Sequence, residues 1–90
     1  MSVEFDRAYD LDPQVSLRPE PFGALAYHFG NRKLSFLRSA DMVALVTSLS
    51  EHESVAAALS DLGIDSRRWP SFQRALNQLF ASEMIHERVE

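Results

Sequence analysis

The sequence predicts an α+β domain of winged-helix-like type, in which a three-stranded antiparallel sheet is followed by three helices. Between residues 15 and 37, apolar and polar residues alternate, which is the period of a half-buried strand. Beyond residue 39, apolar residues recur at helical spacing, and serines stand where helix N-caps are needed. A chain of 90 residues is long enough for one hydrophobic core and too short for two.

The three strands are expected at residues 15–18, 24–29 and 32–37. We expect the segment Pro19-Glu20-Pro21 to interrupt the first strand, because proline lacks the N–H that a central ladder needs. Gly30-Asn31 separates the second and third strands. Glycine at the first position of a two-residue loop predicts a type II′ hairpin turn.

This hairpin predicts a register in which Tyr27 faces Leu34 and Leu25 faces Phe36, so that large apolar side chains share one face. A slip of one residue would mix the two faces. Because an apolar sheet face needs a cover, we expect the helices to pack on it. The opposite face carries the remaining cross-strand pairs, which are Ala24 with Leu37, Ala26 with Ser35 and His28 with Lys33.

The helices are placed by their expected caps. Ser39 is a favourable N-cap for the first helix, and Ser54 for a short second helix that Gly63 ends. Asp65 is expected to cap the turn into the third helix, where Pro70 is tolerated because it lies in the first turn. The third helix has an apolar stripe formed by Trp69, Phe72, Leu76, Leu79, Phe80 and Met84.

The N-terminal residues 1–14 show no clear hydrophobic period, and we interpret them as a partly ordered arm before a domain at residues 15–90. The arm is expected to be ordered only if Phe5 or Tyr9 docks on that domain.

Several kinds of chemistry are not indicated. The chain has no cysteine, and its three histidines (His28, His52 and His86) do not stand at metal-site spacings, so we expect no metal, no cofactor and no catalytic site. The N-terminus lacks the basic and apolar regions of a secretory signal, and no apolar run reaches the roughly 20 residues that a membrane helix needs. The sequence therefore predicts a soluble, cytoplasmic binding module with no membrane partner.

The charge distribution suggests where a ligand would bind. The net charge is −4, yet six of the nine basic residues lie in two clusters, which are Arg32, Lys33 and Arg38, and Arg67, Arg68 and Arg74. The third strand is expected to have an open edge that could pair with an added strand. If the second cluster lies across a groove from this edge, the basic walls would attract an acidic, extended peptide. Two ordinary solvated faces would account for the same clusters.

The segment at residues 17–39 reads LRPEPFGALAYHFGNRKLSFLRS. Its parts RPEPFGAL, YHFG and LSFL resemble the signature of the mycofactocin-system peptide chaperones, the MftB family, and the similarity extends over most of residues 15–85. This resemblance implies a PqqD-like precursor-recognition element that acts in the biosynthesis of a redox cofactor. Such proteins bind the leader of the ribosomally made precursor peptide MftA and deliver it to the radical SAM enzyme MftC.

In related recognition elements the leader is added as a strand beside the third strand and packs toward the third helix. By position, the resemblance implies two groups of peptide-binding residues. Those for the ladder are Arg32, Lys33, Leu34, Ser35, Phe36, Leu37 and Arg38, and those for apolar contact are Phe72, Leu76, Leu79 and Phe80.

Two other functions remain open from the sequence. A winged-helix nucleic-acid binder would expose Arg67, Arg68, Gln73, Arg74, Asn77 and Gln78 on a recognition helix, although the acidic net charge counts against it. A homodimerisation module would pair two copies of the third-strand edge.

Overall fold

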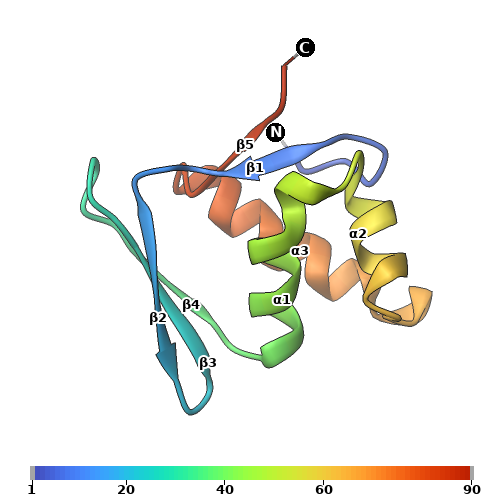
Figure 1. Ribbon diagram of the computed structural model, residues 1–90, viewed down its shortest axis with the longest axis horizontal. Coiled ribbons are helices and arrows are strands. Elements are labelled where there is room, and N and C mark those ends of the chain that lie inside the picture. Colours follow the sequence, from blue (N-terminus) through green and yellow to red (C-terminus); the bar gives the residue numbers. More distant parts are fainter. Residues whose placement is uncertain (1, 90) are drawn as a thin grey trace.

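The computed structural model describes residues 2–89 and has the predicted α+β class (Figure 1). A three-stranded antiparallel sheet has the order β2-β3-β4, and a second, two-stranded sheet pairs β1 with β5. The strands are β1 (Tyr9–Leu11), β2 (Val15–Glu20), β3 (Gly23–His28), β4 (Leu34–Leu37) and β5 (Ile85–Glu87). The helices are α1 (Ala40–Ser48), α2 (Val55–Asp61) and α3 (Trp69–Ala81), with the short 3-10 turns η1 (Leu49–Glu51) and η2 (Ser66–Arg68).

The predicted register of the β3–β4 hairpin is confirmed, since Leu25 faces Phe36 and Tyr27 faces Leu34. The predicted type II′ turn is wrong. Residues 29–32 form a longer loop, and it is Arg32 rather than Gly30 that takes a positive φ, of 63°. A Cβ at position 30 would lie 2.8 Å from Cε1 of His28, whose ring is buried, so glycine is favoured there for space.

The predicted break at Pro19 is also wrong, because β2 continues to Glu20. The N–H of Phe29 donates a hydrogen bond to the carbonyl oxygen of Gln14, and that of His28 donates one to Lys33. Because hydrogen bonding alternates along an antiparallel strand, odd-numbered residues of β3 bond to β2 and even-numbered ones bond to β4. Pro19 lies opposite Ala24, so its missing N–H would have faced away from the sheet. Proline is tolerated at such a position of an edge strand.

The helices cover the sheet face that was not expected to be covered. Ala24, Ala26 and Leu37 are 2%, 1% and 1% exposed, whereas Leu34 and Phe36 on the other face are 57% and 58% exposed. The three helices lie on one side of the β2-β3-β4 sheet (Figure 1), and α1 contacts β3. We attribute this choice of face to the small alanine side chains, which let a helix approach the sheet closely.

The predicted caps are confirmed. The Ser39 hydroxyl accepts a hydrogen bond from the N–H of Met42, and the Ser54 hydroxyl accepts one from Ala57. Gly63 follows α2 with a φ of +71°, as a helix-ending glycine does. Asp65 caps the turn before α3, and Pro70 lies in the first turn of that helix. Within residues 2–89 the structure has no helix of the length and apolar character needed to cross a bilayer.

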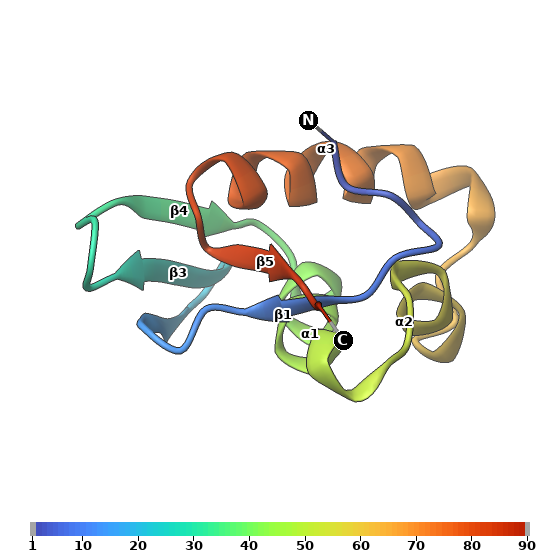
Figure 2. The same ribbon diagram turned by 90° about the horizontal axis from the view of Figure 1, so that it is seen from above.

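The N-terminal segment packs on the rest of the chain. Tyr9 is 2% exposed, and its ring meets that of Phe80 edge to face at 6.0 Å. Val3 is fully buried. The sequence did not predict β1 or β5, which lie side by side in Figures 1 and 2.

Candidate functional site

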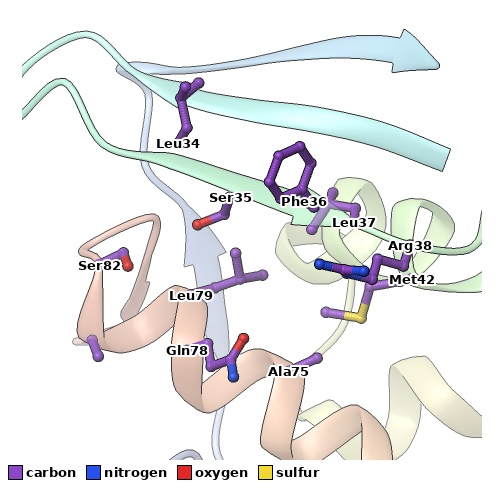
Figure 3. Close-up of a pocket in the computed structure, with 11 residues that line it drawn as sticks. Leu34, Ser35, Phe36, Leu37, Arg38, Met42, Ala75, Gln78, Leu79 and Ser82 are labelled. Carbon is purple, nitrogen blue, oxygen red and sulfur yellow. The ribbon is translucent and has the colours of Figure 1, made fainter. Parts of the chain in front are cut away.

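A groove separates the outer edge of β4 from α3 (Figure 3). Its volume is about 440 Å³. One wall is the strand, and the other is the face of α3 that carries Ala75, Gln78 and Leu79. The full lining consists of Leu34, Ser35, Phe36, Leu37, Arg38, Met42, Ala75, Gln78, Leu79, Ala81 and Ser82.

The edge of β4 offers backbone groups for an added strand. In residues 2–89, β4 pairs with β3 and with no other strand. The N–H of His28 donates a hydrogen bond to the carbonyl oxygen of Lys33, so the odd-numbered residues of this strand bond to β3. The backbone groups of Ser35 and Leu37 therefore point toward β3, and those of Leu34 and Phe36 point away from it. The Ser35 side chain points toward α3, whereas the Leu34 and Phe36 side chains lie on the opposite side of the strand (Figure 3). Leu34 and Phe36 are therefore the residues that could form a ladder with a peptide.

The opposite edge of the sheet, on β2, is less suited to strand addition. By the same alternation, the backbone groups that face outward there belong to Val15, Leu17 and Pro19. The Val15 N–H already bonds to the carbonyl oxygen of Asp12 at 3.0 Å, and Pro19 has no N–H. One outward donor, at Leu17, is left in this strand.

A smaller hollow of about 250 Å³ continues the groove toward the start of α3. Two arginines line it. The Arg38 guanidinium lies 5.6 Å from the centre of the Phe36 ring, and that of Arg68 lies 5.3 Å from the centre of the Phe72 ring. Arg68 also pairs with Asp41 at 3.1 Å. Neither the groove nor this hollow is lined by an acidic side chain within residues 2–89, so the arginine end is the positive end.

At its other end the groove is bordered by a contact between the β3–β4 loop and the end of α3. The Asn31 side-chain amide donates a hydrogen bond to the carbonyl oxygen of Ser82, at 3.0 Å. Ser82 lines the groove. A peptide lying in the groove would therefore meet this contact at one end and the two arginines at the other.

The structure brings together some of the predicted peptide-binding residues and not others. The groove is lined by Leu34, Ser35, Phe36, Leu37, Arg38 and Leu79, and Phe72 lines the smaller hollow that continues it. Arg32 and Lys33 are exposed in the loop between β3 and β4. Leu76 is fully buried in the core, and the Phe80 ring packs on Tyr9.

Sequence reasoning missed the small and polar side of the groove. Ser71, Ala75, Gln78 and Ser82 recur at spacings of three and four along α3, and each lines the groove or its continuation. The row of small and polar residues beside the apolar stripe was the available signal for a surface that something else could contact.

The second basic cluster is mostly not part of the groove. Arg67 makes a bidentate pair with Asp65, and Arg74 does not line the groove. Two further residues of the supposed recognition helix hold the N-terminal segment, because Asn77 accepts from the Val3 N–H and Gln73 donates to the Val3 carbonyl. Arg68 alone of its cluster lines the hollow. This arrangement does not resemble a helix that reads bases.

The histidines make structural contacts. His28 is 5% exposed, and its Nδ1 accepts from the N–H groups of Gly30 and Asn31, which orders the β3–β4 loop. His86 bonds to Asp12. The backbone N–H of Gln14, followed by His86, holds the pKa of the Asp12 carboxyl below its usual range. No group of three or more potential metal ligands occurs in the described part of the chain.

Comparison with known proteins identifies a family that the chain resembles. A family model described as the peptide chaperone MftB family matches residues 8–86. A protein named peptide chaperone MftB from Mycobacterium ulcerans is 46% identical over 80 residues, which are 89% of this chain and 73% of that protein. Its namesake from Mycobacterium tuberculosis is 44% identical over 89 residues, which are 97% and 82% of the two chains. No solved structure matches the chain.

Proposed function

The chain belongs to the peptide chaperone MftB family, and from that premise we propose that it binds the leader of the mycofactocin precursor peptide MftA as an added strand and presents it to the radical SAM enzyme MftC. It is a peptide chaperone and not an enzyme. The handover would take place in the cytoplasm, because ribosomes make the precursor there.

The observation that carries this proposal is the position of the open β4 edge directly beside the groove. The backbone groups of Leu34 and Phe36 face away from β3, and α3 forms the opposite wall. An extended peptide can satisfy such groups with its own backbone and place alternate side chains in the groove. Because β4 has four residues, the paired part of the peptide is short.

The groove also favours a particular peptide chemistry. Side chains that point toward α3 would contact Leu79 and Ala75, which favours apolar residues at alternate positions. Side chains at the Arg38 and Arg68 end would be favoured if they are acidic. The ligand class is therefore an extended peptide with alternating apolar residues and an acidic residue near one end of the paired part.

The test is calorimetric titration of this protein with the MftA leader and with a scrambled leader of equal charge. We expect saturable one-to-one binding of the leader alone. Equal binding of the two peptides would reduce the interaction to charge attraction and contradict the proposal.

A groove-filling variant and a matched control locate the site. Ala75→Leu places a larger side chain in the groove and should weaken leader binding at least tenfold. Arg74→Leu changes the neighbouring exposed residue, which lies outside the groove. Because an exposed charge contributes little, this variant should bind the leader with an affinity within about twofold of wild type. Equal effects of the two variants would exclude this groove.

Homodimerisation through the β4 edge is a competing state of the same site. Two copies could pair their Leu34 and Phe36 backbones, as exposed strand edges do. If so, sedimentation should show a concentration-dependent dimer that the leader peptide dissociates. A dimer that persists at saturating leader would place the self-interface elsewhere.

A further inference from the structure

The outer face of the β2-β3-β4 sheet carries a continuous apolar surface. No element of residues 2–89 packs on this side, as Figures 1 and 2 show. The exposed apolar residues are Phe22 at 43%, Phe29 at 64%, Leu34 at 57% and Phe36 at 58%, and the half-buried Leu25 and Tyr27 lie on the same face. We call these six residues the outer face. Contiguous exposed apolar surface on a small domain commonly marks an interaction site.

The rings of the outer face are ordered by contact with one another. Phe22 meets Phe36 at 5.9 Å, and Tyr27 meets Phe29 at 5.1 Å, both edge to face. A hollow is lined by Phe22, Phe36 and Arg38. Aromatic and arginine side chains around a hollow are the residue types that dominate protein–protein binding energy.

The charges around the outer face differ in sign from those of the rest of the chain. Arg38 lies over the Phe36 ring and lines the hollow on this face. Arg18, which is opposite Leu25, pairs with Glu20 at 3.0 Å. The border thus has two arginines, Arg38 and Arg18, and one acid, in a chain whose net charge is −4.

These charges indicate which kind of protein would bind to the outer face. A second copy docked through the same face would bring like charges together, because a two-fold interface places a patch against itself. A different protein with an apolar patch bordered by carboxylates would be complementary. The face also adjoins the groove, because Phe36 contributes its ring to the outer face and its backbone to the open edge.

We propose that the outer face docks the enzyme that receives the peptide, through an apolar patch bordered by acidic residues on that enzyme. This inference rests on the proposed function, since it assumes that a peptide is bound at the adjacent edge. A partner on the outer face would lie across one strand from the bound leader. The chaperone would then hold both proteins on the two sides of β4.

The experiment measures two bindings separately, that of the MftA leader and that of purified MftC loaded with its iron–sulfur clusters. The main variant is Phe22→Ser with Phe29→Ser, because neither side chain lines the groove or its continuation. Leu62→Ser with Val89→Ser is the matched control, since both residues are exposed and apolar and neither belongs to the β2-β3-β4 sheet. Arg18→Glu tests the basic border without removing an apolar group.

We expect the Phe22/Phe29 variant to lose at least tenfold in affinity for MftC while its affinity for the leader stays within twofold, and the control to change neither. Arg18→Glu should slow association with MftC at low salt. Unchanged binding of MftC by the Phe22/Phe29 variant would overturn the inference, as would an equal loss of both bindings. Self-association that this variant abolishes, with MftC binding intact, would identify the face as a dimer interface and overturn it as well.

Failure of the inference and failure of the proposed function give different results. If the wild type binds the leader and not MftC, the docking face is excluded while peptide recognition stands. If the wild type binds MftC and not the leader, the proposed function fails, and so does the placement of the two proteins on either side of β4.

Discussion

The side-chain amide of Asn31 and the carbonyl oxygen of Ser82, which are 51 residues apart in the chain, are joined by a hydrogen bond of 3.0 Å. This bond connects the β3–β4 loop to the end of α3, and it therefore connects the two walls of the groove. Asn31 also accepts a hydrogen bond from the N–H of Lys33 through its Oδ1. A single side chain thus orders the start of β4 and fixes its distance from α3.

Asn31→Asp separates these two roles, because the carboxylate keeps the acceptor and loses the donor. A carboxylate oxygen beside the Ser82 carbonyl should open this end of the groove. We expect leader affinity to fall about fivefold, the equivalent of about 1 kcal/mol for one hydrogen bond. Titration calorimetry measures it. Gln14→Glu, which adds the same charge near the loop, is the control, and an equal loss in both variants would show that charge is the cause.

Leu34→Pro tests the outward ladder donor. The Leu34 N–H faces away from β3, so proline should leave the sheet paired and weaken leader binding by about 1 kcal/mol for the missing bond. Leu34→Ala controls for the side chain. Ser35→Pro should instead lower the melting temperature, because the Ser35 N–H points toward β3. A folded, fully stable Ser35→Pro variant would show that the alternation is the reverse of the one described.

The sequence predicted the elements that local chemistry determines. Serine caps, the helix-ending Gly63 and the pairing of Leu25 with Phe36 follow from neighbouring residues, and each is confirmed. It did not predict β1 and β5, because each strand has three residues and pairs across almost the whole chain. Such short strands carry too little period to be recognised.

The sequence could not determine which face of the sheet is covered. Alternation showed that Leu25, Tyr27, Leu34 and Phe36 share a face, but the covered face has the alanines, which α1 can approach. The same limit applies to the candidate site. The residues of β4 that the resemblance implied line the groove, whereas Leu76, which the resemblance also implied, is buried in the core and Phe80 packs on Tyr9.

Arg38→Ser tests whether the groove attracts the leader electrostatically. Arg38 lines the groove and its continuation, whereas Arg32 lies in the β3–β4 loop and lines neither. We expect Arg38→Ser to slow association severalfold at low ionic strength and to have little effect at high salt, because screening removes long-range attraction. Stopped-flow measurements of the leader give both rates. Arg32→Ser is the matched control, and an equal or greater slowing in that variant would place the attraction outside the groove.

Tyr9→Ala tests whether residues 1–14 belong to the folded unit. The ring is 2% exposed and packs on Phe80, so its removal should cost about 3–5 kcal/mol of unfolding free energy. Tyr9→Phe removes only the hydroxyl that accepts from the Glu4 N–H, at a cost of about 1 kcal/mol. Urea titration measures both. A Tyr9→Ala variant as stable as the wild type would support an arm that is separable from residues 15–90.

His52 should make stability depend on pH in the neutral range. Its Nδ1 lies 2.9 Å from the Ser48 carbonyl oxygen and its Nε2 lies 3.2 Å from Asp61, and these partners, Ser48 first, raise the pKa of His52 above 6.5. Because the folded pKa is raised, this stabilisation is fully present below about pH 6.5 and is lost as the pH rises through the folded value.

His52→Gln should therefore flatten the decrease in melting temperature as the pH rises above 6.5, because the folded pKa of His52 lies above that value. The difference from wild type isolates His52, because His28 and His86 are present in both proteins. Asp61→Asn removes the second partner and keeps the Ser48 contact, so its profile should lie between the two. If wild type and His52→Gln lose stability in parallel across this range, His52 is not the group that titrates.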